Sequence, residues 1–448
     1  EYLVSDRNLG GFVLAMTLVA TYLSAGSFIG GPGTAYTIGL SWVFLAMSQM
    51  PTGYFTLSVL GKRFAIVARK INAVTVTDFL YARYENKLLI VIISICVVFF
   101  FIAAMTAQFI GAARLLEGAV GVPYQTGLAF FSITVLAYTI IGGFRAVALT
   151  DALQGTIMTI GVIVVFIGAV LAGGGVSNII QMLYAIEPGL ISPLGANPEF
   201  TSMAWVTSFW VLVGFGIIGL PQVATRAMSY RDTKSFKRAV VFGTIVSMVL
   251  LLLMHLLGLF GRVLVPDIAS GDLVVPTVTT FLFPNWIAGI ILAAPLAAVM
   301  STVDSQLLLA VGAIVNDVYA NLVNPEIKKT AYITFGVAVI IGGIAFAAAF
   351  NPPDLLVWLN LHAIAGLIAT FLWPVLLGLY WKRANTAGAF ASIIAGVGSY
   401  MYFFYFLPRP LGAHAIFATL LIALAAFLIF TYLTPKPKYQ IIAKFWGL

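Results

Sequence analysis

Charged residues are scarce in this sequence of 448 residues. Asp, Glu, Lys and Arg make up only 8% of it, whereas hydrophobic residues make up 61%. A soluble globular domain carries about 25% charged residues, because polar side chains cover its surface. The shortage excludes an ordinary soluble domain. Apolar stretches of about 20 residues, the length with which a helix crosses a bilayer, recur along the chain instead and predict an all-α integral membrane protein.

Cysteine and histidine are almost missing. The single cysteine, Cys96, lies inside an apolar stretch, which excludes a disulfide framework and a thiolate metal site. The three histidines, His255, His362 and His414, lack the spacing of metal ligands. No Gly-x-Ser-x-Gly elbow, His-Glu-x-x-His motif or Walker A loop is present, so the sequence does not indicate a hydrolase or an ATP-driven pump.

Twelve stretches are long enough to be membrane-spanning helices. They cover residues 10–36, 40–61, 88–118, 124–142, 146–172, 203–229, 236–263, 286–320, 330–350, 354–381, 384–406 and 412–434. Of the 23 Lys and Arg residues, all but Arg114, Arg262 and Arg409 fall on the side of the N-terminus. Because cytoplasmic loops are enriched in basic residues, we expect both termini in the cytoplasm. The net charge of +8 is therefore assigned to membrane topology and lipid contact, and not to nucleic-acid binding.

Two of the stretches are interrupted by small residues and proline. The first contains TYLSAGSFIGGPG, residues 21–33, and we expect its helix to break and restart at Gly31, Pro32 and Gly33. The second, within 208–226, carries in mid-span Gly214, Gly216, Gly219 and Pro221. Their starts lie five spans apart, and interrupted spans at equivalent places of two five-helix halves indicate a transporter built from inverted repeats. The alternative is that these glycines only allow helices to pack closely.

An unwound membrane helix exposes backbone groups that cannot form hydrogen bonds with lipid. We therefore expect the first break to line a binding site for an ion or substrate, to which Ser24 and Ser27 contribute hydroxyl groups. In the span 286–320, Ser301 and Thr302 follow Ala298 by about one helical turn, so two hydroxyls and one carbonyl can converge. Hard cations prefer oxygen ligands, and with carbonyls of the broken helix this pattern predicts a sodium site. The alternative is that both hydroxyls bond only to the preceding turn.

Two of the aspartates within the predicted spans are candidates for a function. Asp304 lies near the middle of 286–320, where a carboxylate is a functional candidate by default, and we expect it to contact a cation. A protonated, hydrogen-bonded carboxyl is the alternative. Asp151 lies at the cytoplasmic start of 146–172, where capping the helix or pairing with Arg145 is an equal alternative to function.

Together, six stretches make the chain resemble the sodium:solute symporter family over nearly its full length. They are TYLSAGSFIGGPGTAY, NAVTVTDFLYARY, AQFIGAARLLE, GGFRAVALTDALQG, TSFWVLVGFGIIGLPQ and AAPLAAVMST. The resemblance implies a LeuT-like fold, with one inverted repeat in residues 1–172, a second in 203–381, and accessory helices with a cytoplasmic tail in 382–448. It implies sodium-coupled uptake by alternating access across the bacterial inner membrane, with pantothenate as the expected substrate.

The resemblance also implies ligands. The sodium site would be formed by the carbonyls of Ala20, Leu23 and Ala298 and the hydroxyls of Ser301 and Thr302. A second cation site, present in some members, would involve Asp151, Ser301, Asp304 and Ser305. Tyr22 stands where proline-transporting relatives carry an aspartate, which argues against proline as the substrate.

For the substrate we expect a pocket that combines hydroxyl and amide groups with aromatic walls. Its predicted residues are Ser24, Ser27, Gly30, Gly31, Gln49, Gln108, Trp210, Phe215 and Asn360. The positive end of the restarted first helix is expected to face the substrate carboxylate. We predict a transporter and not an enzyme. The open alternatives are another small monocarboxylate or an amino acid as substrate, proton coupling through Asp304, and an intramembrane enzyme. The two aspartates are the only candidate catalytic groups for such an enzyme.

Overall fold

The structure, a computed structural model, describes residues 10–196, 202–228, 230–323 and 330–447, without the side chains of residues 142–149, 321–323, 330 and 331. The described part is built of helices and contains no strand, so the predicted all-α class is confirmed. Arg7, Lys328 and Lys329, which contribute to the predicted orientation, lie outside the described residues, as does the side chain of Arg145.

The helices follow one another along the chain with short connections. The first half contains α1 (Gly11–Tyr22), η1 (Gly26–Gly30), α2 (Gly31–Ile38), α3 (Leu40–Met47), α4 (Thr52–Thr56), η2 (Leu57–Gly61), α5 (Lys62–Ile71), α6 (Val76–Tyr84), α7 (Lys87–Val120), α8 (Tyr124–Ala172), α9 (Val176–Ile186) and η3 (Pro188–Ile191). The second half contains α10 (Met203–Phe209), η4 (Trp210–Phe215), η5 (Gly216–Gly219), α11 (Pro221–Ala227), α12 (Thr233–Leu264), η6 (Gly271–Leu273), α13 (Val274–Leu282), α14 (Asn285–Gly312), η7 (Ala313–Val323), α15 (Thr330–Ala348), α16 (Leu356–Tyr380), α17 (Thr386–Phe406), η8 (Pro410–Gly412), α18 (Ala415–Leu433) and α19 (Tyr439–Trp446).

Eight helices of the described part are long and apolar enough to cross a membrane, or up to ten if each of two bent pairs is one span. Two further predicted spans are also helical: residues 40–61 are divided into α3, α4 and η2, and residues 330–350 contain α15. The spans predicted at 124–142 and 146–172 correspond to two of the eight, Tyr124–Ile141 and Thr150–Ala172, and α8 continues as one helical element from the first to the second. The segment between them contains no proline that would end a helix.

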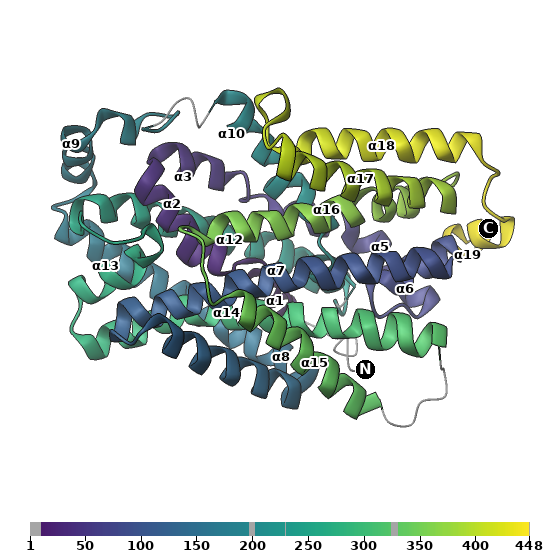
Figure 1. The fold of residues 1–448 in the computed structure, drawn as a ribbon, viewed down its shortest axis with the longest axis horizontal. Coiled ribbons are helices and arrows are strands. Elements are labelled where there is room, and N and C mark those ends of the chain that lie inside the picture. The colour runs from purple at the N-terminus through teal and green to yellow at the C-terminus, as the bar shows by residue number, and fades with distance from the viewer. Residues whose placement is uncertain (1–9, 197–201, 229, 324–329, 448) are drawn as a thin grey trace.

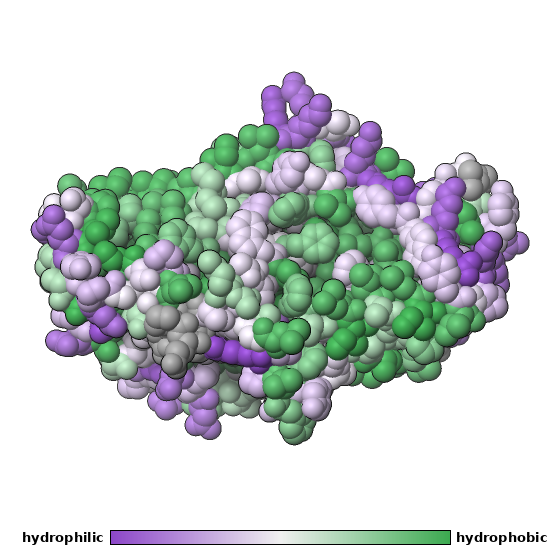
Figure 2. Space-filling model, turned by 90° about the horizontal axis from the view of Figure 1, so that it is seen from above, coloured by the Kyte–Doolittle hydropathy of each residue, from purple (hydrophilic) through white to green (hydrophobic). Residues whose placement is uncertain are grey.

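The long helices run along the longest axis of the molecule, with α9 and α13 at one end and α5, α6 and α19 at the other (Figure 1). Hydrophobic residues cover much of the face in Figure 2, and hydrophilic residues gather at the two ends of the long axis and at the upper edge of the view. Large apolar side chains such as Ile141 (85% exposed) and Leu171 (74% exposed) point outward, as lipid contact requires. At the centre, α16 is the most buried of the candidate spans.

The first bent pair joins α1 to η1 and α2 at an angle of 69°. Helix α1 ends at Tyr22, Leu23 has extended backbone (φ −78°, ψ 125°), and the helix resumes at Gly26. The break predicted at Gly31, Pro32 and Gly33 is therefore misplaced, because these residues lie inside the helical run of η1 and α2. The unwound link comes earlier, at residues 23–25.

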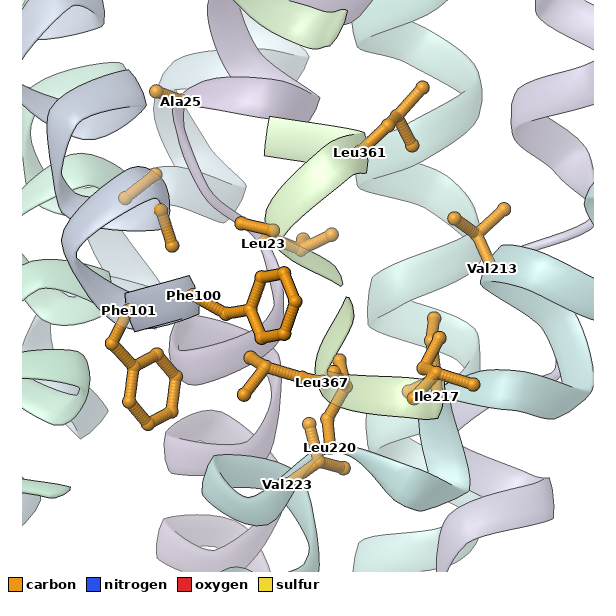
Figure 3. Packing of buried hydrophobic residues seen from close by; sticks show 14 of the residues in the cluster. Leu23, Ala25, Phe100, Phe101, Val213, Ile217, Leu220, Val223, Leu361 and Leu367 are labelled. Atoms are coloured by element: carbon orange, nitrogen blue, oxygen red, sulfur yellow. The ribbon is translucent and has the colours of Figure 1, made fainter. Parts of the chain in front are cut away.

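The second bent pair joins α10, η4 and η5 to α11 at 55°. Its break lies at Leu220, whose backbone is extended (φ −78°, ψ 121°), between the predicted Gly219 and Pro221. Gly214 and Gly216 precede this break and lie in the irregular helical turns of η4 and η5, respectively. Figure 3 shows Leu23 and Ala25 on the first unwound link, and Leu220 near Leu367 of α16.

Candidate functional site

Two hydroxyl groups on α14 meet backbone carbonyls of α1 where that helix ends. The Ser301 hydroxyl lies 2.7 Å from the carbonyl of Ala20 and 3.1 Å from that of Ala298. The Thr302 hydroxyl lies 3.2 Å from the carbonyl of Leu23 and 2.9 Å from that of Ala298. All five residues are buried. The structure thus places the five predicted sodium ligands in one cluster of oxygen atoms, and sodium binding there stays a prediction.

Local structure explains why these oxygens converge. Because α1 stops at Tyr22, the carbonyls of its last turn lack the amides that a longer helix would supply. On α14, Ser301 and Thr302 follow Ala298 by three and four positions. The three residues therefore share one face of the helix, and this face is turned toward α1. The cluster carries no formal charge. Its oxygens are the ligand type that hard cations such as sodium prefer.

Arg226 of α11 lies beside two members of the predicted second cation site. Its Nη2 atom donates to Ser305 Oγ at 2.7 Å and to Asp151 Oδ2 at 3.4 Å. Asp151 lies inside α8, which begins at Tyr124, so the alternative that it caps a helix start is wrong. Arg226 is only 2% exposed, although by sequence it counts among the basic residues on the cytoplasmic side.

Asp304, the other charged candidate of this site, forms hydrogen bonds with different residues. Its Oδ1 atom accepts hydrogen bonds from Tyr138 (2.7 Å) and Thr139 (2.5 Å) of α8. Its other oxygen is buried without a hydrogen-bond partner among the described residues. Asp304 thus shares none of these hydrogen bonds with Asp151 and Ser305, although it lies near enough to Asp151 for the two charges to interact, and its contact with a cation stays a prediction.

A small cavity opens beside the first unwound link. It is lined by Tyr22, Ser24, Gly26, Ser27, Gly31, Trp42, Leu45, Gln49, Phe209, Val213, His255, Val357, Asn360, Leu361 and Ile364. Its volume is about 30 Å³, far below the roughly 300–1,000 Å³ of a typical ligand pocket. A substrate with a dozen or more heavy atoms can enter only after side chains or helices move.

Five of the predicted substrate residues line this cavity: Ser24, Ser27, Gly31, Gln49 and Asn360. The other four lie elsewhere. Trp210 on η4 is 51% exposed, and Phe215 at the end of η4 is half-buried outside the lining. Gly30 packs against Leu356 at the start of α16. Gln108 contacts the amide of Ala25 in the unwound link but is not among the residues that line the cavity.

Gln108 of α7 holds the unwound link in place. Its Oε1 atom accepts a 2.8 Å hydrogen bond from the amide of Ala25, and its Nε2 atom donates to Asn360 at 3.3 Å. The amide of Gly26 bonds to the Ser24 hydroxyl at 3.1 Å. Side chains thus satisfy amides that the break leaves without helical partners, as buried backbone groups require.

The polar lining includes two residues that sequence reasoning missed. Tyr22 donates a 2.7 Å hydrogen bond to Gln49 Oε1. His255 of α12 has its Nδ1 atom 2.7 Å from the carbonyl of Leu251, so Nδ1 carries the proton and Nε2 is an acceptor. A Cβ atom at Gly31 would collide with Nε2, which places this acceptor against the restarted helix. A lone histidine within an apolar span was the available signal.

Aromatic side chains close one side of the cavity. Trp42 and Phe209 line it, with ring centroids 5.9 Å apart. Trp205 and Trp358 form a second layer, at 6.5 and 5.6 Å from Trp42. These rings come from α3, α10 and α16, so they join segments from both halves of the chain.

Comparisons with known proteins agree with this geometry. Residues 2–396 match the model of the sodium:solute symporter family. The chain is 49% identical over 399 residues to a sodium/pantothenate symporter of Escherichia coli (strain K12), covering 88% of this chain and 82% of that protein. It is 46% identical over 405 residues to a sodium/pantothenate symporter of Haemophilus influenzae, covering 90% and 83%. Among solved structures, a Na+-coupled sialic acid symporter in a substrate-bound outward-open state aligns with a TM-score of 0.78, at 20% identity over 98% of this chain and 93% of that one.

Proposed function

This chain belongs to the sodium:solute symporter family, and on that premise we propose that it imports pantothenate with sodium by alternating access. It is a multi-pass membrane transporter, not an enzyme, and sodium is its coupling ion. The substrate is proposed from the two sodium/pantothenate symporters to which the chain is similar. The observation that carries coupling is the convergence of Ser301 and Thr302 on the open end of α1.

Sodium is proposed to bind between α1 and α14. Its ligands would be the carbonyls of Ala20, Leu23 and Ala298 and the hydroxyls of Ser301 and Thr302. An ion at this place bonds to both helices, so it holds the unwound link in one position against α14. Since the link also lines the cavity, sodium and substrate stabilise the same arrangement. Each must then raise the affinity for the other by the same factor.

Pantothenate is proposed to bind in the cavity beside the link. The molecule has two hydroxyl groups, an amide and a carboxylate, and the cavity offers hydroxyl, amide and imidazole partners from Ser27, Gln49 and His255. The carboxylate is placed near Ser24 and Gly26, where the positive end of the η1 and α2 segment points. No charged side chain is among the lining residues, so the backbone dipole supplies the favourable field.

The orientation is proposed from charge. Basic side chains such as Arg63 and Arg69 lie on α5, at the end of the molecule that also holds α6 and α19 (Figure 1). Because basic residues favour the cytoplasm, this end is placed inside and both termini are cytoplasmic, in a bacterial inner membrane. We divide the chain into inverted repeats at 1–172 and 203–381, followed by accessory helices and tail in 382–448, with the bent pairs as equivalent first helices.

The deciding experiment is uptake of labelled pantothenate into liposomes that contain the purified protein. An inward sodium gradient alone should drive accumulation, and an equal potassium gradient should not. Accumulation driven by a proton gradient without sodium would instead favour coupling through Asp304. Competition by unlabelled carboxylates and amino acids tests the substrate: inhibition by another compound at lower concentrations than unlabelled pantothenate requires would contradict the proposal.

A further inference from the structure

A buried arginine lies about one helical turn from the proposed sodium ligands. Ser305 follows Ser301 by four residues on α14, and Thr17 precedes Ala20 by three on α1. Asp151 of α8 and Arg226 of α11 complete the group, and all four of its side chains are buried. We call these residues, Thr17, Asp151, Arg226 and Ser305, the arginine cluster.

The cluster is built around the guanidinium group. Nη2 donates to Ser305 Oγ at 2.7 Å and to Asp151 Oδ2 at 3.4 Å, and Nη1 donates to the carbonyl of Gln222 at 3.2 Å. Asp151 Oδ2 also accepts a 2.7 Å hydrogen bond from Thr17. The carboxylate of Asp151 and the hydroxyl of Ser305 thus bond to a single buried positive charge, and the Thr17 hydroxyl bonds to that carboxylate.

Without the guanidinium group, these oxygen atoms could serve as ligands of a sodium ion. A carboxylate and hydroxyls, buried and close to a first sodium ion, form a typical oxygen site for a hard cation. Here the guanidinium already neutralises the carboxylate. A sodium ion added to the cluster would bring a second positive charge against one negative charge, and at low dielectric such repulsion is strong.

We propose that Arg226 is a built-in cation that keeps a second sodium ion out of the cluster, so that one sodium ion accompanies each substrate molecule. The inference rests on the proposed function, since it concerns the stoichiometry of that transport. Asp151 is the carboxylate that bonds to the guanidinium, whereas Asp304 Oδ1 accepts its hydrogen bonds from Tyr138 and Thr139. The consequence is thermodynamic: one sodium ion with one pantothenate anion moves no net charge.

The test on the unaltered protein is a zero-flux measurement. Liposomes are given a tenfold inward sodium gradient, the membrane potential is clamped at zero with valinomycin and equal potassium, and the opposing pantothenate ratio is varied until net flux stops. One sodium ion per substrate predicts zero flux at a tenfold ratio, and two predict a hundredfold ratio. Shifting the clamped potential should leave the tenfold ratio unchanged.

The outcomes separate the two proposals. Zero flux at a hundredfold ratio, or a ratio that moves with potential, would overturn the role of Arg226 while sodium-driven pantothenate uptake stands. Absence of any sodium-driven uptake would contradict the proposed function itself. A tenfold ratio that is independent of potential supports both.

Variants test whether Arg226 itself sets the ratio. Arg226→Gln removes the cation but leaves Asp151, and its zero-flux ratio should rise above tenfold as sodium enters the cluster. The double variant Arg226→Gln with Asp151→Asn removes both charges and should return to tenfold, whatever its rate. Arg226→Lys keeps a positive charge and should also stay at tenfold. A tenfold ratio in a transporting Arg226→Gln variant would contradict the proposal, and if that variant does not fold, a ratio above tenfold in the double variant would do so.

Discussion

The Ser301 hydroxyl on α14 lies 2.7 Å from the carbonyl oxygen of Ala20 in the last turn of α1, across 281 positions of sequence. The contact joins a helix that is broken in mid-span to one that is continuous. The next residue, Thr302, makes a second contact of this kind, between its hydroxyl and the carbonyl of Leu23. The binding of an ion to these oxygens therefore depends on the position of α1 relative to α14. Coupling requires this dependence, because the ion then favours one arrangement of the two helices.

Ser301→Ala and Thr302→Ala should each raise the sodium concentration needed for half-maximal uptake, by about tenfold if one ligand contributes roughly 1.4 kcal/mol. The reason is the loss of one oxygen from a cluster of five. The measurement is initial uptake against sodium concentration. Ser392→Ala, at a buried serine of α17, is the matched control and should leave the curve in place. Unchanged sodium dependence in both variants would refute the proposed site.

Gln108→Met should weaken both substrate and sodium binding, because the Ala25 amide loses its 2.8 Å acceptor. An unsatisfied buried amide costs about 1–3 kcal/mol, which corresponds to a loss of affinity of roughly five- to 150-fold if the link is displaced. Isothermal titration of the detergent-solubilised protein measures both affinities. Methionine matches glutamine in length, so the packing volume is retained. Wild-type affinities in this variant would show that Gln108 does not hold the link.

His255→Leu should lower pantothenate affinity by about tenfold, the effect of losing one hydrogen bond of roughly 1.4 kcal/mol. His255→Gln keeps an acceptor and should retain more of the affinity. Because Nε2 faces the cavity and not the sodium ligands, the sodium dependence at saturating substrate should be unchanged. Competition by pantothenate analogues that lack one hydroxyl identifies the partner: the analogue that loses its disadvantage in His255→Leu lacks the group that His255 binds. Equal affinities in all three proteins would exclude this role.

Gly258→Ala should destabilise the protein and abolish uptake. A Cβ at this position of α12 would collide with the backbone of Pro32, so α2 and α12 could no longer approach. Gly336→Ala in α15 is the control, because a Cβ there meets nothing within 4 Å, and a change to alanine inside a helix is neutral or stabilises by about 0.5–1 kcal/mol. Thermal unfolding of both variants in detergent provides the comparison. A fully active Gly258→Ala protein would contradict this packing.

Periodicity and composition were sufficient to predict the helical class and the face of α14 that carries Ser301 and Thr302, because spacing along a helix fixes which side chains share a face. The same reasoning misplaced the first break. Glycines allow unwinding but do not require it, and the chain unwinds at residues 23–25, where Gln108 from another helix supplies an acceptor. That acceptor belongs to tertiary structure, so local sequence does not reveal it.

Arg226 and His255 were missed for a similar reason. Arg226 follows a proline-containing turn near the predicted end of its span, and its sequence neighbours include Arg231, so it resembled one more loop cation. Only the packing of α11 against α8 and α14 shows that its charge is buried and paired. For His255, the proton on Nδ1 is assigned from its contact with Leu251, a detail that depends on side-chain geometry.

The aromatic group that closes the cavity has an optical consequence. Trp42, Trp205 and Trp358 are three of the eight tryptophans in the chain, and their rings lie within 6.5 Å of one another. Movement of α3 or α10 away from α16 would separate these indoles and admit water, so the intrinsic fluorescence of the unlabelled protein is expected to follow the opening of this side of the cavity in real time.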